Sequence, residues 1–236
     1  MGRYDSLSST TLTTEAARAE RVGAFLRAVY LWMCVGLAVT ALVALYVSGT
    51  NWSMTIARNP WLLMGLFIVQ LGVVITLSAG VSRLSPGTAT LLFLGYSALT
   101  GVTFSFILLV YTGQSIATTF FVTAGMFGAL ALYGTTTARS LAGWGQFLFM
   151  GLIGVILASL VGIFWHSNAL QFLITFAGVI VFTGLTAYDA QRLKLMALAL
   201  PEGNVGSYAI AGALSLYLNF VNLFLMLLRL SGGRRD

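Results

Sequence analysis

The sequence has little charge, and acidic residues are the scarcest of all. Only 8% of the 236 residues are charged, against about 25% in an ordinary soluble domain. Lys and Arg number 12 and Asp and Glu number 6, and Asp189 is the only acid between Glu20 and Glu202. Any function that needs a negative charge within the fold therefore depends on Asp189.

Cysteine and histidine are nearly absent. Cys34 is the single cysteine, which excludes an intramolecular disulfide and a thiol-based metal cluster. His166 is the single histidine, and beside Trp165 it has the character of an interfacial pair rather than of a catalytic base. No second acid, cysteine or histidine completes a hydrolytic site, and neither GxxxxGKS nor GxxxxGKT occurs. The sequence thus predicts neither an enzyme nor a bound cofactor.

Apolar residues are what the chain has in abundance: 58% of it is hydrophobic and its mean hydropathy is +0.94. A membrane-spanning helix needs about 20 mainly apolar residues. Seven such segments are present, at about 25–47, 61–80, 88–110, 116–133, 145–165, 170–191 and 208–228. The sequence predicts an all-α integral membrane protein with a seven-transmembrane-helix bundle over residues 25–228. A polar N-terminal tail, 1–24, and a basic C-terminal tail, 229–236, flank it.

The basic residues indicate the orientation of the chain. With seven spans, eight fall on the side of the N-terminus: Arg3, Arg18, Arg21, Arg27, Arg83, Arg139, Arg192 and Lys194. Four fall on the other side: Arg58, Arg229, Arg234 and Arg235. Because basic loops stay in the cytoplasm, the N-terminus is expected there, and such scattered charges do not predict nucleic-acid binding. Three of the four opposing charges follow the last span, so a six-span bundle with a re-entrant last segment is the alternative.

Two of the apolar segments carry polar residues on one helical face. Steps of three or four residues along the sixth segment reach Gln171, Thr175, Gly178, Phe182, Thr186 and Asp189, and along the seventh Tyr208, Gly212, Ser215, Asn219, Asn222 and Met226. An amide without a partner in hydrocarbon costs a few kcal/mol, so both faces are expected to turn inward. The amides either join helices, at about 0.6 kcal/mol each, or line a functional site.

Asp189 is the strongest candidate for such a site. An ionised carboxylate within the hydrocarbon costs several kcal/mol unless it is paired, hydrated or protonated, and such residues usually mark function. Asp189 also lies only five residues before Lys194, about 8 Å along a helix. An interfacial position, in which Asp189 pairs with Arg192 or caps the loop, is therefore the alternative.

Familiar motifs occur along the chain. It ends on FTGLTAYDAQRLK and then LSLYLNFVNLFLMLLRL, and upstream it reads SRLSPGTATLLFLGYSALTGVTFSFILLVYT, SIATTFFVTAGMFGALALYG and WGQFLFMGLIGVI. Over nearly the whole chain, these segments resemble the Bax inhibitor-1 family, the transmembrane Bax inhibitor motif proteins. The resemblance implies a seven-helix fold with the C-terminal helix central to the other six. It also implies a pH-sensitive calcium leak and, for a bacterial-type member, a place in the cytoplasmic membrane.

One departure from the family pattern affects the expected sensor. Bacterial members are described as having two aspartates, one in the YD of the sixth helix and one in LYLDF of the seventh. The first matches Asp189, but the second falls on Asn219, because this chain reads LYLNF. Two close carboxylates share a proton, whereas an Asp and an Asn do not, so the pH response is expected to be weakened or displaced. The family's locking arginine, which follows the second span and pairs with the sixth-helix acid, falls on Arg83.

The sequence therefore predicts a membrane cation leak, for calcium by resemblance, gated near Asp189. Asp189, Asn219 and Arg83 are the expected path and sensor residues, with Asn222, Ser215 and Thr186 as supporting polar lining. Asp189 is expected to bind calcium transiently, so the partners are the lipid bilayer and calcium ions. The alternative is a non-conducting protein that regulates another membrane protein through its lipid-exposed faces. The missing second aspartate favours that alternative.

Overall fold

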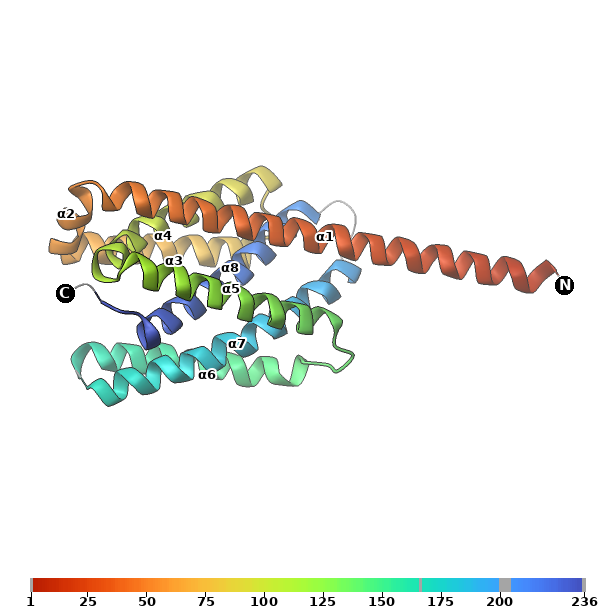
Figure 1. Ribbon diagram of the computed structural model, residues 1–236. Coiled ribbons are helices and arrows are strands. Elements are labelled where there is room, and N and C mark those ends of the chain that lie inside the picture. Colours follow the sequence, from red (N-terminus) through yellow and green to blue (C-terminus); the bar gives the residue numbers. More distant parts are fainter. Residues whose placement is uncertain (1, 166, 200–204, 235–236) are drawn as a thin grey trace.

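The computed structural model describes residues 2–165, 167–199 and 205–234, and nearly all of them are helical (Figure 1). His166, which the sequence places in an interfacial pair, lies outside the described residues. The helices are α1 (Gly2–Ser48), α2 (Trp52–Arg58), α3 (Pro60–Gly80), α4 (Pro86–Val110), α5 (Gly113–Thr136), α6 (Ala142–Phe164), α7 (Asn168–Ala199) and α8 (Val205–Ser231). Within the described ranges, extended pairing is limited to a single bridge between Tyr111 and Arg234.

Local sequence signals define several helix starts. Asn59 and Ser85 precede prolines at the first helical positions of α3 and α4, and their side chains accept hydrogen bonds from Trp61 N and Thr88 N. Thr112 caps α5 in the same way. Proline suits the first position of a helix, because the N–H that it lacks would have no partner there. The side chain before it accepts a hydrogen bond from another N–H of the first turn. These residues therefore mark sharp starts for the apolar helices.

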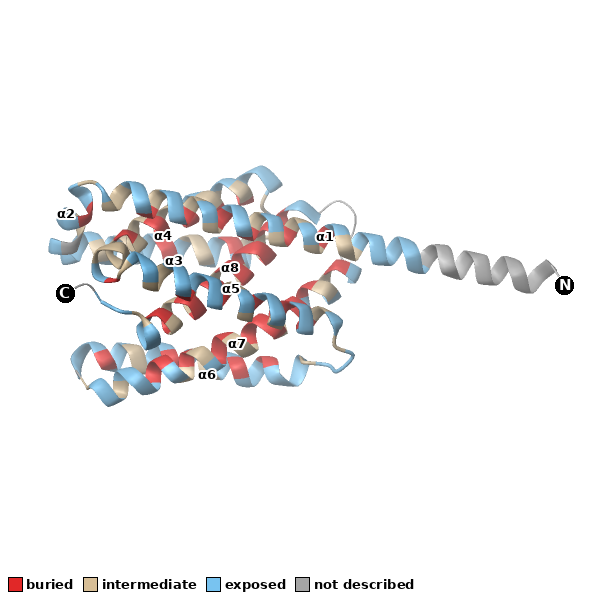
Figure 2. Ribbon diagram, in the orientation of Figure 1, coloured by how far each residue is buried: buried red, intermediate tan, exposed pale blue. Residues whose placement is uncertain are grey.

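Seven of the helices are long and apolar enough to cross a membrane, which confirms the predicted bundle. They are α1, from Glu15 onward, and α3 to α8. The short helix α2 is an addition that the apolar pattern does not show. The first helix is continuous from Gly2 and extends beyond the bundle (Figure 2). From Glu15 onward, where its side chains are described, Phe25 is the first buried one.

Helix α8 is the central helix, as the resemblance implies. It is the most buried of the seven spans, and it packs against α1, α3, α4, α5 and α7 (Figure 2). Helix α6 instead packs on α7. At the middle of α8, the fully buried Tyr217 makes a 2.6 Å hydrogen bond with Thr40 Oγ1 and edge-to-face contacts with Phe93 and Tyr96. Because the Tyr217 hydroxyl is hydrogen-bonded and its ring packs on two aromatic rings, this residue fixes α8 against α1 and α4.

The C-terminal end of the chain lies where seven crossings would place it. Helix α8 runs the length of the bundle, and after it Gly233 O accepts a 3.1 Å hydrogen bond from Thr112 N. Gly233 N donates to Ser115 Oγ at 2.9 Å. The tail is thus fixed to the α4–α5 connection, at the end of the molecule opposite the N-terminus (Figure 1). This arrangement favours seven spans over the re-entrant alternative, which would return the tail to the α3–α4 end.

Candidate functional site

Asp189 is buried on α7 and is held by two side chains of α8. Only 8% of its surface is exposed. Its Oδ2 accepts a 2.6 Å hydrogen bond from Ser215 Oγ and a 2.8 Å hydrogen bond from Asn219 Nδ2. Ser215 and Asn219 are four residues apart, so they project from successive turns of one face of α8. The predicted inward orientation of the two polar faces is confirmed here.

No ion pair neutralises this carboxylate within the part of the chain that the structure describes. The other carboxylate oxygen, Oδ1, accepts no hydrogen bond from the described residues, and Asp189 lines two cavities. The alternative in which Asp189 pairs with Arg192 is not realised as a direct contact, although Arg192 lines the same cavities. Two neutral donors therefore hold Oδ2, and Oδ1 is available to a ligand.

The larger of the two cavities, which we call the Asp189 cavity, has a volume of about 870 Å³ and lies between α3, α6, α7 and α8. Its polar lining residues are Gln70, Ser78, Tyr96, Gln146, Tyr188, Asp189, Arg192, Ser215, Asn219 and Asn222. A smaller cavity of about 210 Å³ extends from Asp189 and Ser215 toward Met196 and Tyr208, near the α7–α8 connection. Polar groups thus continue from the buried acid toward the end of the bundle where α7 ends and α8 begins.

Three predicted site residues make no hydrogen bond or ion pair with Asp189 in the part of the chain that the structure describes. Arg83 is exposed in the turn between α3 and α4, and no ion pair links it to Asp189 among the described residues. Thr186 is fully buried and its hydroxyl donates to Phe182 O of its own helix at 2.7 Å. Asn222 lines the Asp189 cavity, but its Nδ2 donates to Leu218 O at 2.8 Å. The structure therefore brings Asp189, Ser215 and Asn219 together and leaves Arg83 and Thr186 apart.

The cavity also includes residues that sequence reasoning missed. Gln70 is 8% exposed and donates to Thr103 Oγ1 at 3.1 Å, and Gln146 on α6 lines the same cavity. An amide inside an apolar segment is a visible signal, and the same reasoning that selected Asn219 would have selected both glutamines. Tyr96 and Tyr188 carried no such signal, because a tyrosine suits a helix interface as well as a cavity wall.

Another polar cavity lies at the other end of α7 and α8. It has a volume of about 400 Å³ and is lined by Tyr111, Asn168, Gln171, Phe172, Thr175, Arg229, Leu230 and Arg234. We call it the basic vestibule, because its lining includes two arginines and no acid. Gln171 and Thr175 belong to the polar face that the sequence predicts on this helix.

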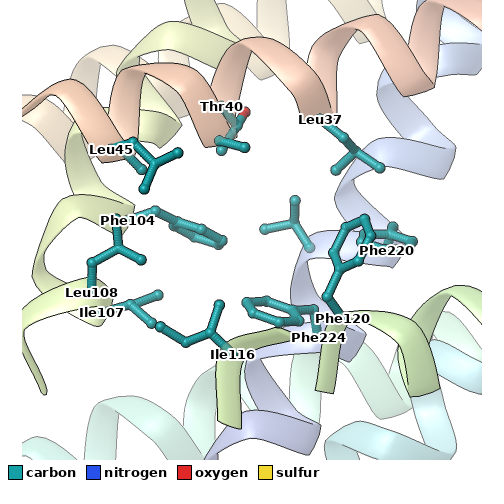
Figure 3. A pocket seen from close by; sticks show the side chains of 13 residues that line it. Leu37, Thr40, Leu45, Phe104, Ile107, Leu108, Ile116, Phe120, Phe220 and Phe224 are labelled. Atoms are coloured by element: carbon teal, nitrogen blue, oxygen red, sulfur yellow. The ribbon is translucent and has the colours of Figure 1, made fainter. Parts of the chain in front are cut away.

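A further cavity is apolar and does not suit an ion. It has a volume of about 210 Å³ between α1, α4, α5 and α8, and Leu37, Leu45, Phe104, Phe120 and Phe220 are among its lining residues (Figure 3). Thr40 is its one hydroxyl, and that group bonds Tyr217 and the carbonyls of Gly36 and Ser97. This cavity thus lacks the acid that lines the Asp189 cavity.

No group of three or more His, Cys, Asp and Glu side chains that could hold a metal is present in the described ranges. A single carboxylate with amide and hydroxyl neighbours offers oxygen ligands of the kind that hard cations prefer, but too few charges for a tightly bound ion. The arrangement suits a transient cation contact rather than a resident metal.

The fold and this site define an integral membrane protein with an acid buried inside its helix bundle. Comparison with known proteins gives the family. The chain belongs to the Bax inhibitor-1 family: the family model described as Inhibitor of apoptosis-promoting Bax1 matches residues 22–236.

Several bacterial proteins are similar to the chain over most of their length. The inner membrane protein YbhL of Escherichia coli strain K12 is 54% identical over 215 residues, which cover 89% of this chain and 92% of YbhL. An uncharacterized protein of Borreliella burgdorferi is 44% identical over 216 residues, with 90% and 93% coverage. The uncharacterized protein RP147 of Rickettsia prowazekii is 38% identical over 230 residues, with 96% and 98% coverage.

Proposed function

We propose that this protein passes cations, calcium in particular, through a path gated at Asp189. The observation that carries the proposal is one buried carboxylate, without an ion-paired partner in the described residues, that lines a polar cavity inside a membrane bundle. The cost of a charge at such a position is several kcal/mol, and intramembrane acids of this kind are associated with ion pathways.

The hydrogen bonds of Asp189 suggest how a cation would use the site. Ser215 and Asn219 donate to Oδ2 and stabilise the ionised carboxylate in a fixed orientation. A cation would meet Oδ1 first, together with hydroxyl and amide oxygens of the cavity wall. Because the single acid gives one negative charge, binding would be weak enough for release, as conduction requires.

Asn219 sets the expected pH response of this path. The amide donates to the carboxylate and cannot share a titrating proton with it. Flux through the native protein should therefore vary little with pH in the neutral range, in contrast to relatives with two aspartates.

The proposed location is a bacterial cytoplasmic membrane with the N-terminus in the cytoplasm. The distribution of basic residues supports this orientation, and the relative YbhL carries the name of an inner membrane protein. In this orientation the Asp189 cavity and its smaller extension lie toward the cytoplasm. The basic vestibule and the C-terminal tail face the opposite side.

The second candidate is a non-conducting protein that binds and regulates another membrane protein. The observation in its favour is Asn219 at the family's second acidic position. Calcium flux into liposomes that contain only the purified protein separates the two functions. The proposal expects flux well above that of protein-free liposomes, whereas flux equal to that background at every pH would favour the interaction protein.

A further inference from the structure

The same faces of α7 and α8 line both the Asp189 cavity and the basic vestibule. On α7 the vestibule extends to Thr175, and the Asp189 cavity begins at Phe182. On α8 the Asp189 cavity extends to Asn222, and the vestibule begins at Arg229. The polar lining is therefore interrupted over the same two turns of both helices.

Gly178 and Met226 occupy this interruption. Met226 is 8% exposed and belongs to an apolar cluster with Val155, Ile174 and Leu223. A Cβ atom placed on Gly178 would lie 2.9 Å from Met226 Sδ and 3.0 Å from its Cγ. The thioether thus lies directly against the bare backbone of α7, and the absence of a side chain at Gly178 is what makes room for it.

From this geometry we infer that Met226, packed on Gly178, is the permeation barrier between the Asp189 cavity and the basic vestibule. An apolar constriction can close a narrow path by excluding water and ions from it. Methionine is unbranched and has three rotatable side-chain bonds. A rotamer change at Met226 could therefore connect the two cavities without moving either helix.

The groups on the two sides of the barrier differ in charge. On one side, Asp189 supplies the negative charge that attracts a cation. On the other side, Arg229 and Arg234 are positive, and Gln171 and Thr175 supply the amide and hydroxyl oxygens. A cation that crosses at Met226 would leave the Asp189 carboxylate and approach two arginines. Its energy along the path would therefore be highest at the apolar layer.

The inference names the barrier of the proposed path, and so it rests on the proposed function, but its test does not need conduction. In a Cys34→Ala background, the reactivity of Gln171→Cys reports how easily a reagent enters the basic vestibule. The reactivity of Asn222→Cys reports its entry into the Asp189 cavity. Spheroplasts and inverted vesicles are treated with a membrane-impermeant, cationic methanethiosulfonate. The informative side is the one from which Gln171→Cys reacts.

From that side, Asn222→Cys should react at least about tenfold more slowly than Gln171→Cys while Met226 is present. Adding Met226→Ser should raise the rate of Asn222→Cys toward that of Gln171→Cys. Adding Met226→Leu, which keeps an apolar side chain of similar volume, should leave it slow.

Equal rates for the two reporters with Met226 in place would overturn the inference, and so would an unchanged slow rate with Met226→Ser. If the labelling follows the expected pattern but the purified protein passes no calcium, the proposed function fails while the barrier remains. If calcium passes but the labelling is insensitive to Met226, the barrier fails alone.

Discussion

At the scale of residues, the pairing of Asp189 with Ser215 and Asn219 is the feature that separates this chain from a protein with two acids. Each hydrogen bond to a charged group contributes about 1.5–3 kcal/mol, and two of them offset much of the cost of burying the charge. These bonds allow Asp189 to stay in the bundle without an ion-paired basic side chain among the described residues. Asn219 supplies a donor where a second aspartate would supply a repelling charge.

Substituting this amide should create a pH-dependent leak. Asn219→Asp places a second carboxylate within hydrogen-bonding distance of Asp189. The two acids should share one proton, because a nearby like charge disfavours the second ionisation, and we expect its release at about pH 6–8 in the apolar bundle. Calcium competes with that proton, so flux into liposomes should rise with pH across this range, whereas the native protein should show no such step.

The matched control for this prediction is the double variant Asp189→Asn/Asn219→Asp, which again has one acid. Its flux should be as insensitive to pH as that of the native protein. If the double variant titrates like Asn219→Asp, the response does not arise from a pair of carboxylates and Asp189 is not the sensor.

At the scale of helices, close backbone approach fixes α7, and with it the position of Asp189. A Cβ atom on Gly134 of α5 would collide with the carbonyl oxygen of Ala187, two residues before the acid. Closer to the C-terminal end of α7, Lys194 Nζ donates to Thr135 O at 2.7 Å. Gln191 Oε1 accepts from Leu141 N at 2.7 Å, and Gln191 Nε2 donates to Arg139 O at 2.9 Å. The α5–α6 connection is thus tied to the end of α7.

Gly134→Ala should consequently destabilise the bundle. The added methyl group meets backbone rather than a movable side chain, and overpacking of this kind costs about 1–3 kcal/mol. Thermal unfolding in detergent should show a lower midpoint than the native protein.

Gly128→Ala is the control on the same helix, because no atom lies within 4 Å of the Cβ position there. That variant should be as stable as the native protein or slightly more so, since alanine favours a helix by about 0.8–1 kcal/mol over glycine. Equal destabilisation by both variants would show that the α5–α7 contact is not tight.

Helix positions could be predicted from the sequence, but contacts between helices could not. The length of the apolar runs was enough to place the seven spans. Periodicity showed which faces of α7 and α8 are polar, but not that Asp189 meets Ser215 and Asn219, because relative helix rotation depends on packing across the bundle. The predicted pairing of Arg83 with Asp189 failed for the same reason, because a position after the second span does not determine where the side chain reaches.

At the scale of the whole molecule, the seven crossings place the two ends of the chain on opposite sides of the membrane. The tail bonds Thr112 and Ser115, and a Cβ atom on Gly232 would lie 2.8 Å from the ring of Tyr111. These contacts fix the tail at the mouth of the basic vestibule, to which it contributes Arg234.

A cysteine at position 233 should therefore label from the outside only. With Cys34→Ala to remove the native thiol, Gly233→Cys should react with an impermeant maleimide in spheroplasts and stay unreactive in sealed inverted vesicles. A Ser140→Cys variant, in the exposed α5–α6 connection, should give the reverse pattern. Labelling of both positions from the same side would contradict the seven-span topology.

The most direct measurement is calcium flux through purified protein in liposomes, comparing the native chain with Asp189→Asn and with Glu15→Gln. Both substitutions exchange a carboxylate for an amide. Glu15 is exposed on α1, whereas Asp189 is buried and lines its cavity. Asp189→Asn should lower flux by about tenfold or more, because it removes the only acid of the path, while the folded fraction stays native. Glu15→Gln should conduct like the native protein. Native flux from well-folded Asp189→Asn would contradict a path gated at Asp189.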